Sequence, residues 1–242
     1  MQEVLTPRRA PLTVERIVDT SRALLVEGGP EAVVVREVAR RLEVTAPALY
    51  RHVSGRDDLL TLLIAACSDE ATAAAAAGRD SVPAHDPVAR LREATWAFRS
   101  WALGHPAEFG LVFGTPVAGY AAPEDGPTTA ASQRFGAFFG GLFAELLAAG
   151  LLRTVDARTL TAGERESLRA FAARVGAPWG PGETYPFVEG YHRMLGSITV
   201  EVSGHLRWAF PDAEAFVRRQ LDELLDDLLV TRPDRPASAP PS

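Results

Sequence analysis

The chain has 242 residues, with 47% apolar side chains, one cysteine and a formal net charge of −6. This length and composition suit one or two soluble globular domains that fold without a disulfide or metal, and the single Cys67 fits a reducing cytoplasm. The acidic balance argues at first against nucleic acid as a partner, and we expect no signal peptide and no membrane-spanning run.

The charge is distributed unevenly along the sequence. Residues 1–56 hold nine arginines against seven acids, a balance of +2, whereas residues 57–242 hold sixteen arginines against twenty-four acids, a balance of −8. For nucleic-acid binding the distribution of charge matters more than its total. The asymmetry is a weak indication that the N-terminal end faces DNA.

Helical spacing dominates the N-terminal part of the sequence. Thr13 can cap a first helix that ends at Gly28-Gly29-Pro30, and short helices are expected near 35–42 and 46–52. Ser54 then caps a long helix to about residue 77, with Asp57 as the acidic partner in its first turn.

The rest of the chain divides at proline and glycine. Helices are expected over 87–103, from Pro106 to about Gly114, and over 128–149, 161–175, 183–206 and 212–230. We therefore predict an all-α fold with a three-helix helix-turn-helix domain (1–60) and a larger helical domain (61–231). The fold is expected to contain about nine to ten helices, most of them in the larger domain. The proline-rich tail (232–242) is expected to be disordered.

The informative stretch is a compact helix-turn-helix between Val33 and Leu60. Two short helices are joined at Leu42-Glu43-Val44, and the hydroxyl of Thr45 can accept from free amides of the second helix. That helix has seven or eight residues, enough to lay one face in a major groove. The residues expected in its core are Val38, Ala39, Leu42, Val44 and Leu49.

Residues 12–62 resemble the DNA-binding domain of the TetR family of regulators. The residues that carry the resemblance are Arg36, Ala39, Leu42, Val44, Thr45, Ala48, Leu49, Tyr50, His52, Val53, Arg56 and Leu59. The resemblance implies that Thr45, Ala46, Pro47 and Ala48 face bases and that Tyr50, His52 and Arg56 contact phosphates. It also implies a base or phosphate contact for Arg36, and Arg51 could serve either purpose. Taken singly, Tyr50 could equally be a half-buried core aromatic, and the arginines solvated surface charges.

Two residues depart from the family pattern. Glu43 stands where the family usually has glycine, so the turn holds a residue for which a left-handed conformation is costly. Val34 stands where serine or threonine often caps the supporting helix, and losing that cap costs about 1 kcal/mol. Neither residue is expected to read bases.

The segments 92–120 and 191–205 resemble a C-terminal domain that accompanies this DNA-binding domain in some actinobacterial regulators. The matching features are Trp101, His105-Pro106, Phe109, Phe113-Gly114-Thr115-Pro116, Gly119-Tyr120, Gly196, Glu201 and Gly204-His205. Apolar residues at helical spacing also predict a homodimer through the last two helices. The expected interface residues are Val188, Tyr191, Leu195, Ile198, Val202, Leu221, Leu224 and Leu228, with a wholly internal core as the alternative.

Aromatic residues concentrate in the middle helices, where they form either a plain core or a cavity. Because such regulators usually bind an effector there, we predict a site for a small apolar or aromatic molecule. Its expected residues are Trp96, Arg99, Phe109, Phe113, Tyr120, Phe135, Phe139 and His192.

The sequence offers no nucleophile motif, phosphate loop, dinucleotide fingerprint or metal-ligand spacing, so we expect neither enzyme activity nor a cofactor. We expect a ligand-responsive repressor that binds a palindromic double-stranded DNA operator as a dimer. The alternative is a small-molecule-binding helical protein with weak or no DNA binding.

Overall fold

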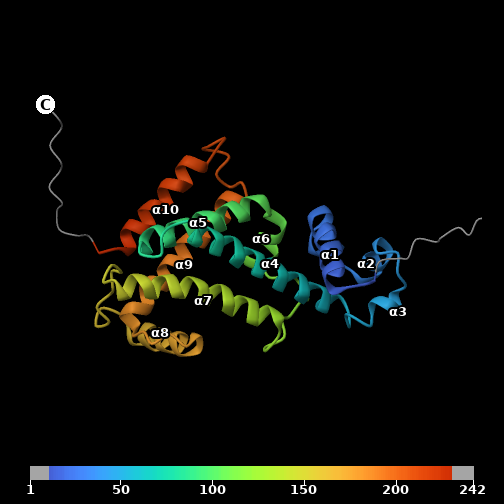
Figure 1. The fold of residues 1–242 in the computed structure, drawn as a ribbon, viewed down its shortest axis with the longest axis horizontal. Helices are drawn as coiled ribbons and strands as arrows, with labels where there is room; N and C mark the ends of the chain where they lie inside the picture. Colours follow the sequence, from blue (N-terminus) through green and yellow to red (C-terminus); the bar gives the residue numbers. More distant parts are fainter. Residues whose placement is uncertain (1–10, 231–242) are drawn as a thin grey trace, which may run out of the picture. The chain divides into compact units, whose positions relative to one another are not determined.

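The computed structural model describes residues 11–230 (Figure 1). Within this range the chain forms ten α-helices and one short 3₁₀ turn, with no strand beyond an isolated bridge between Leu152 and Leu229. The all-α fold expected from the sequence is confirmed. The predicted disordered tail (232–242) lies outside the described residues, as do residues 1–10.

The chain folds into two compact units. The first contains the residues up to Ser68 together with Ala107–Ala131, and the second contains Asp69–Pro106 together with the residues from Ser132 onward. The grouping of Ala107–Ala131 with the N-terminal helices is a long-range feature that the order of elements does not indicate. The expected domain boundary at residue 60 stays a prediction.

The first unit is built on three N-terminal helices: α1 (Val14–Gly28), α2 (Val35–Arg41) and α3 (Ala46–Leu49). It also holds the first half of α4 (Arg56–Asp80) and nearly all of α6 (Pro106–Phe113). The Thr13 side chain caps α1 by accepting from the amide of Arg16, as predicted. The α1 and α2 faces that pack together bury their apolar residues, which include Ile17, Leu24, Leu25, Val38 and Ala39.

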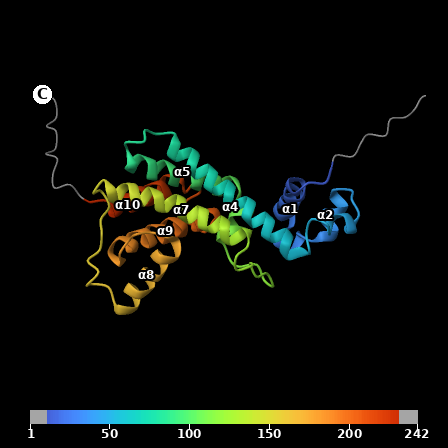
Figure 2. The same cartoon turned by 60° about the horizontal axis from the view of Figure 1, so that its bottom comes forward.

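The second unit holds the second half of α4 and most of the remaining helices. These are α5 (Pro87–Gly104), most of α7 (Pro127–Ala148), α8 (Ala162–Val175), α9 (Pro181–Val202) and α10 (Glu214–Leu228). Helix α9 packs against α5, α8 and α10, and Figure 2 shows α8 next to α9 on the side away from α5. Because α9 touches three neighbours, its residues shape both the core and any cavity in this unit.

Local capping signals fix the ends of several helices in the second unit. Asp86 accepts from the amide of Ala89 at the start of α5 at 2.9 Å. Thr161 and Glu164 form a reciprocal capping box at the start of α8, and Gly176 ends that helix in a left-handed conformation. These are the residues that mark the boundaries in the sequence.

Two local expectations in the first unit need correction. Helix α3 ends at Leu49 rather than near His52, and the amide of His52 donates to the Leu49 carbonyl in a turn instead. Asp57 lies in the first turn of α4 as expected, but it is Asp58 that accepts from the amide of Ser54, at 2.7 Å. Asp58 lies one residue further along the first turn, where its carboxylate reaches back to the chain before the helix.

Helix α4 is, among the described residues, the one helix whose length and apolar composition would suffice to cross a bilayer. Half of that apolar stretch is buried inside the structure.

Candidate nucleic-acid interface and a pocket in the second unit

The turn between α2 and α3 is held by backbone hydrogen bonds. The amide of Val44 donates to the Ala39 carbonyl at 3.0 Å, and the Thr45 hydroxyl accepts from the amide of Ala48 at 3.3 Å. Val38, Ala39 and Leu49 are buried as predicted. The two short helices therefore form a compact helix-turn-helix whose second helix begins at a satisfied cap.

Both departures in the helix-turn-helix have structural consequences. Glu43 has a φ of 54° and is the one residue other than glycine with positive φ in the described chain. This left-handed conformation costs a residue with a Cβ about 1–2 kcal/mol. Val34 is the N-cap of α2, and its side chain makes no capping hydrogen bond.

The residues expected to meet DNA lie on the surface of the first unit. Tyr50 is 54% exposed. In this structure it is therefore not the half-buried core aromatic that the sequence alone also allowed. The other exposed members of the set are Arg36, Thr45, Pro47, Arg51 and His52, while Ala46 and Ala48 are half-buried. The structure thus brings these side chains to the surface of α2, α3 and the turn that follows.

Ion pairs decide which arginines of this surface are free. Arg40 donates to both carboxylate oxygens of Glu37, at 2.9 and 2.6 Å, and Arg41 pairs with Glu27 and Glu37. The Arg40 and Arg41 guanidinium groups lower the pKa of Glu37 to about 2. Arg36 and Arg51 make no ion pair within residues 11–230, so these two cations remain available to phosphates or base edges.

Arg56 has a partner that sequence reasoning missed. Its guanidinium donates to the Pro30 carbonyl at 3.1 Å and lies 3.2 Å from a carboxylate oxygen of Glu31. The side chain is 25% exposed. It ties the start of α4 to the turn after α1, and the phosphate contact expected of it stays a prediction.

The expected effector residues are divided between the two units. Phe109, Phe113 and Tyr120 belong to the first unit, where the Tyr120 hydroxyl lies 2.9 Å from the Thr61 hydroxyl. Trp96, Arg99, Phe135, Phe139 and His192 belong to the second. Much of the aromatic set in the second unit is close-packed, since the ring centroids of Phe98 and Phe135, and of Phe135 and Phe139, are each 5.1 Å apart.

Arg99, expected to be a polar anchor for the effector, is engaged in the protein core. Its guanidinium donates to both carboxylate oxygens of Glu201, at 2.8 and 2.5 Å, and only 4% of Arg99 is exposed. Trp96 lies under two guanidinium groups, those of Arg99 at 5.5 Å and Arg218 at 4.2 Å from its ring. His192 is exposed on α9. The Arg99–Glu201 pair joins α5 to α9, and the contact of Arg218 with Trp96 joins α10 to α5.

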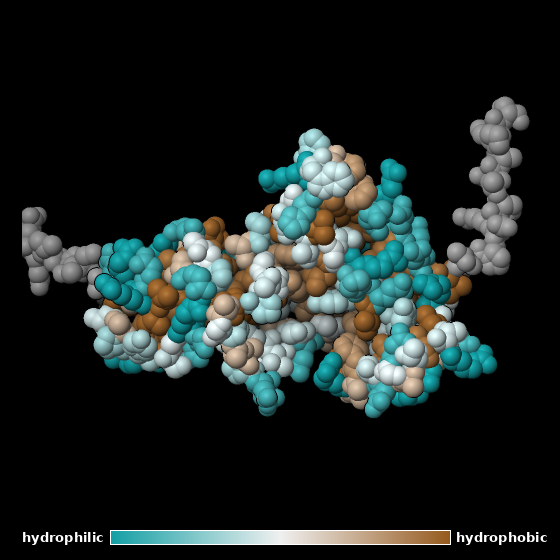
Figure 3. Space-filling view, turned by 180° about the vertical axis from the view of Figure 1, so that it is seen from behind, coloured by the Kyte–Doolittle hydropathy of each residue, from teal (hydrophilic) through white to brown (hydrophobic). Residues whose placement is uncertain are grey.

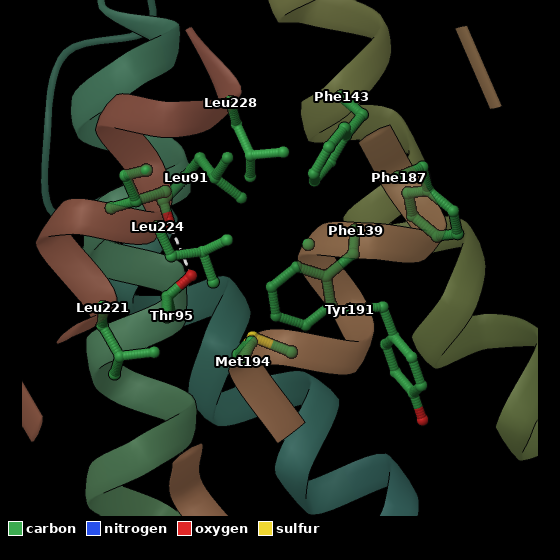
Figure 4. A pocket seen from close by; sticks show the side chains of 12 residues that line it. Leu91, Thr95, Phe139, Phe143, Phe187, Tyr191, Met194, Leu221, Leu224 and Leu228 are labelled. Carbon is green, nitrogen blue, oxygen red and sulfur yellow. Dashed lines mark hydrogen bonds between the residues drawn. The ribbon is translucent and has the colours of Figure 1, made fainter. Parts of the chain in front are cut away.

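A pocket lies in the second unit between α5, α7, α9 and α10 (Figure 4). Its cavity volume is about 20 Å³. Of the expected effector residues only Phe139 lines it. The lining residues are Leu91, Thr95, Phe139, Phe143, Phe187, Gly190, Tyr191, Met194, Leu221, Leu224, Leu225 and Leu228.

The expected dimer residues fall into two groups. Ile198, Leu221, Leu224 and Leu228 are at most 4% exposed within the protomer, and the three leucines line the pocket. Val188 is 39% exposed on α9, and Tyr191, Leu195 and Val202 are partly exposed. Only this second group presents apolar surface to a partner in the structure described, and the interface itself stays a prediction.

Within residues 11–230 no group of three or more histidine, cysteine, aspartate and glutamate side chains is placed to hold a metal ion, and Cys67 is buried.

Known proteins resemble the chain in both units. The family model of bacterial regulatory proteins of the tetR family matches residues 17–63, and that of the tetracyclin repressor-like C-terminal domain matches residues 91–224. The HTH-type transcriptional regulators Rv1816 of Mycobacterium tuberculosis and Mb1846 of Mycobacterium bovis are each 39% identical over 145 residues. That match spans 58% of this chain and 60% of either relative, less than two-thirds of their length.

Solved structures share the fold over most of its length. The regulatory protein SCO4313 is 25% identical with a TM-score of 0.68, covering 88% of this chain and 95% of the other. The TetR family transcriptional regulator PfmR of Thermus thermophilus is 20% identical with a TM-score of 0.55, covering 87% and 97%. An all-helical chain with an N-terminal helix-turn-helix is the form of a DNA-binding bacterial transcriptional regulator. The chain belongs to the TetR family, as its sequence indicated.

Proposed function

We propose that the protein is a transcriptional repressor that binds a near-palindromic DNA operator as a homodimer and responds to a small apolar effector. The observation that carries the proposal is the exposed set on α2, α3 and the following turn, where Arg36 and Arg51 are free of ion pairs within the described chain. Free guanidinium groups beside exposed Tyr50 and His52 supply donors for phosphates and base edges.

The dimer is supported by the part of α9 that the protomer leaves uncovered. Val188, His192 and Leu195 follow one another at helical spacing on a face that is exposed or half-exposed. In a two-fold symmetric dimer, two recognition helices meet half-sites about one helical turn apart.

Selection of bound sequences from random DNA tests the proposal. The wild-type protein is expected to enrich two inverted half-sites, and Arg51→Ala to change the enriched bases or lower their enrichment. Arg169→Ala is the matched control, because Arg169 is an exposed arginine on α8 in the other unit. If wild-type protein enriches no sequence, the repressor proposal fails in favour of a small-molecule-binding helical protein.

A further inference from the structure

The pocket between α5, α7, α9 and α10 is chemically uniform (Figure 4). Nine of its lining residues are leucine, phenylalanine or methionine, one is Gly190, and none carries a charge. We propose that this pocket is the binding site of an uncharged, slender aliphatic molecule. This proposal names the chemistry of the effector. A regulatory role for the bound molecule rests on the proposed repressor function.

The two polar residues of the lining offer little to a polar ligand. The Thr95 hydroxyl donates to the Leu91 carbonyl at 2.9 Å, so its hydrogen is already used. In Figure 4 the Tyr191 hydroxyl points away from the other labelled side chains. Burial raises the pKa of Tyr191. A ligand charge in this pocket would lose its hydration and find no partner.

Two arginines that adjoin residues of the lining are each paired with a carboxylate. Arg92 lies 3.4 Å from Asp222, a pair that links α5 to α10, and Arg193 lies 2.9 Å from Asp227, a pair that links α9 to α10. Each of these four residues is the chain neighbour of a residue in the lining. These pairs link α10 to α5 and α9 and leave neither arginine without a carboxylate, which disfavours a ligand with an ionised carboxylate head group.

The width of the pocket favours a thin molecule over a bulky one. A space of about 20 Å³ holds roughly one water-sized group, so a longer ligand must displace side chains. Met194 can move, since its unbranched side chain has three rotatable bonds. Gly190 keeps the wall open, because a Cβ there would lie 3.0 Å from Leu228 Cδ1 and 3.1 Å from Phe143 Cζ.

The test compares two probes of equal chain length and different charge. 1-Octanol and octanoate, at pH 8 where the acid is ionised, are titrated into the full chain and the melting temperature is recorded. A ligand that binds only the folded state raises the melting temperature in a saturable way. We expect a saturable rise with 1-octanol, on the order of a few degrees, and at least a tenfold weaker response to octanoate.

Matched variants locate the bound molecule. Leu91→Phe fills the pocket and should abolish the response to 1-octanol. Leu168→Phe makes the same change at a buried position of α8 outside the lining and should keep it. If Leu91→Phe does not fold, Gly190→Ala narrows the same wall and should weaken the response. No saturable response in the wild type, an equal response to octanoate, or a response retained in the folded filling variant would each overturn the proposal.

The two proposals fail separately. DNA selection that succeeds in a protein indifferent to 1-octanol refutes the effector chemistry alone. Binding of 1-octanol by a protein that selects no DNA refutes the repressor and leaves the pocket as a small-molecule site.

Discussion

The buried ion pair between Arg99 and Glu201 permits a quantitative prediction. The two side chains are 5% and 8% exposed and share two hydrogen bonds that join α5 to α9. Arg99→Ala would leave the Glu201 carboxylate buried without its cation. Removing one partner of a buried pair costs about 3–5 kcal/mol of unfolding free energy. For a chain of this size each kcal/mol corresponds to about 2–4 °C, so the melting temperature should fall by roughly 6–20 °C.

A second ion pair provides the matched control. Arg90 also donates to both carboxylate oxygens of its partner Glu145, at 2.8 and 3.0 Å, but that pair is 14% and 40% exposed. Arg90→Ala should cost no more than about 1 kcal/mol, because water replaces the lost partner. Urea unfolding followed by circular dichroism measures both variants.

The double variant Arg99→Met with Glu201→Leu separates the cost of an unpaired buried charge from the cost of lost packing. Replacing a whole buried pair by apolar side chains is often neutral or stabilising. We therefore expect the double variant to recover most of the stability that Arg99→Ala loses. The reasoning is refuted if Arg99→Ala and Arg90→Ala cost the same, or if the double variant is less stable than Arg99→Ala.

Three further outcomes concern the helix-turn-helix. Glu43→Gly should raise unfolding free energy by about 1 kcal/mol because it relieves the left-handed strain, whereas Glu43→Ala should not, and equal stabilities would exclude strain. Arg51→Ala should change which bases are preferred in DNA selection, while Tyr50→Phe should weaken binding to all sequences alike, since phosphate contacts carry no sequence information. The pKa of Glu37, lowered to about 2 chiefly by Arg40, lies below its unfolded value, so this group stabilises the fold above about pH 4.5 and the stabilisation is lost as pH falls toward 2. Glu37→Gln should accordingly flatten the acid limb of the stability curve between pH 5 and about 2, and an unchanged limb would contradict this.

Short-range signals made most of the helices predictable. Thr13, the Thr161–Glu164 capping box and Gly176 act within one helical turn, so the sequence contains both the signal and its partner. The end of α3 was harder to predict. Apolar Leu49 and Val53 suit a continued helix and a turn equally well, and the structure uses a turn there.

Long-range contacts limited what could be predicted of the sites. Arg56 was expected to contact phosphate, which stays a prediction, and its contact with the Pro30 carbonyl, 26 residues away, is marked by no local pattern. Arg99 was expected to anchor a ligand, because its actual partner, Glu201, is 102 residues away and nothing in the local sequence points to it. The leucines of α10 could face a partner or their own protomer, and only the packing of α10 on α9 turns them inward.

Helix α9 suggests how an effector could act on the dimer. One face of α9 lines the pocket with Phe187 and Met194, and the adjacent face carries Val188 and Leu195 toward the proposed partner. A molecule that pushes Met194 aside must shift α9 or its neighbours, because cores are close-packed. The ligand can alter dimerisation only by the difference in its affinity for the two states, and couplings of about 1–3 kcal/mol change affinity roughly five- to 150-fold. We therefore predict that 1-octanol changes the dimer dissociation constant by at least fivefold in sedimentation equilibrium, and that Leu91→Phe removes this dependence. A dissociation constant that 1-octanol leaves unchanged, in a protein that binds it, would show that α9 does not transmit the signal.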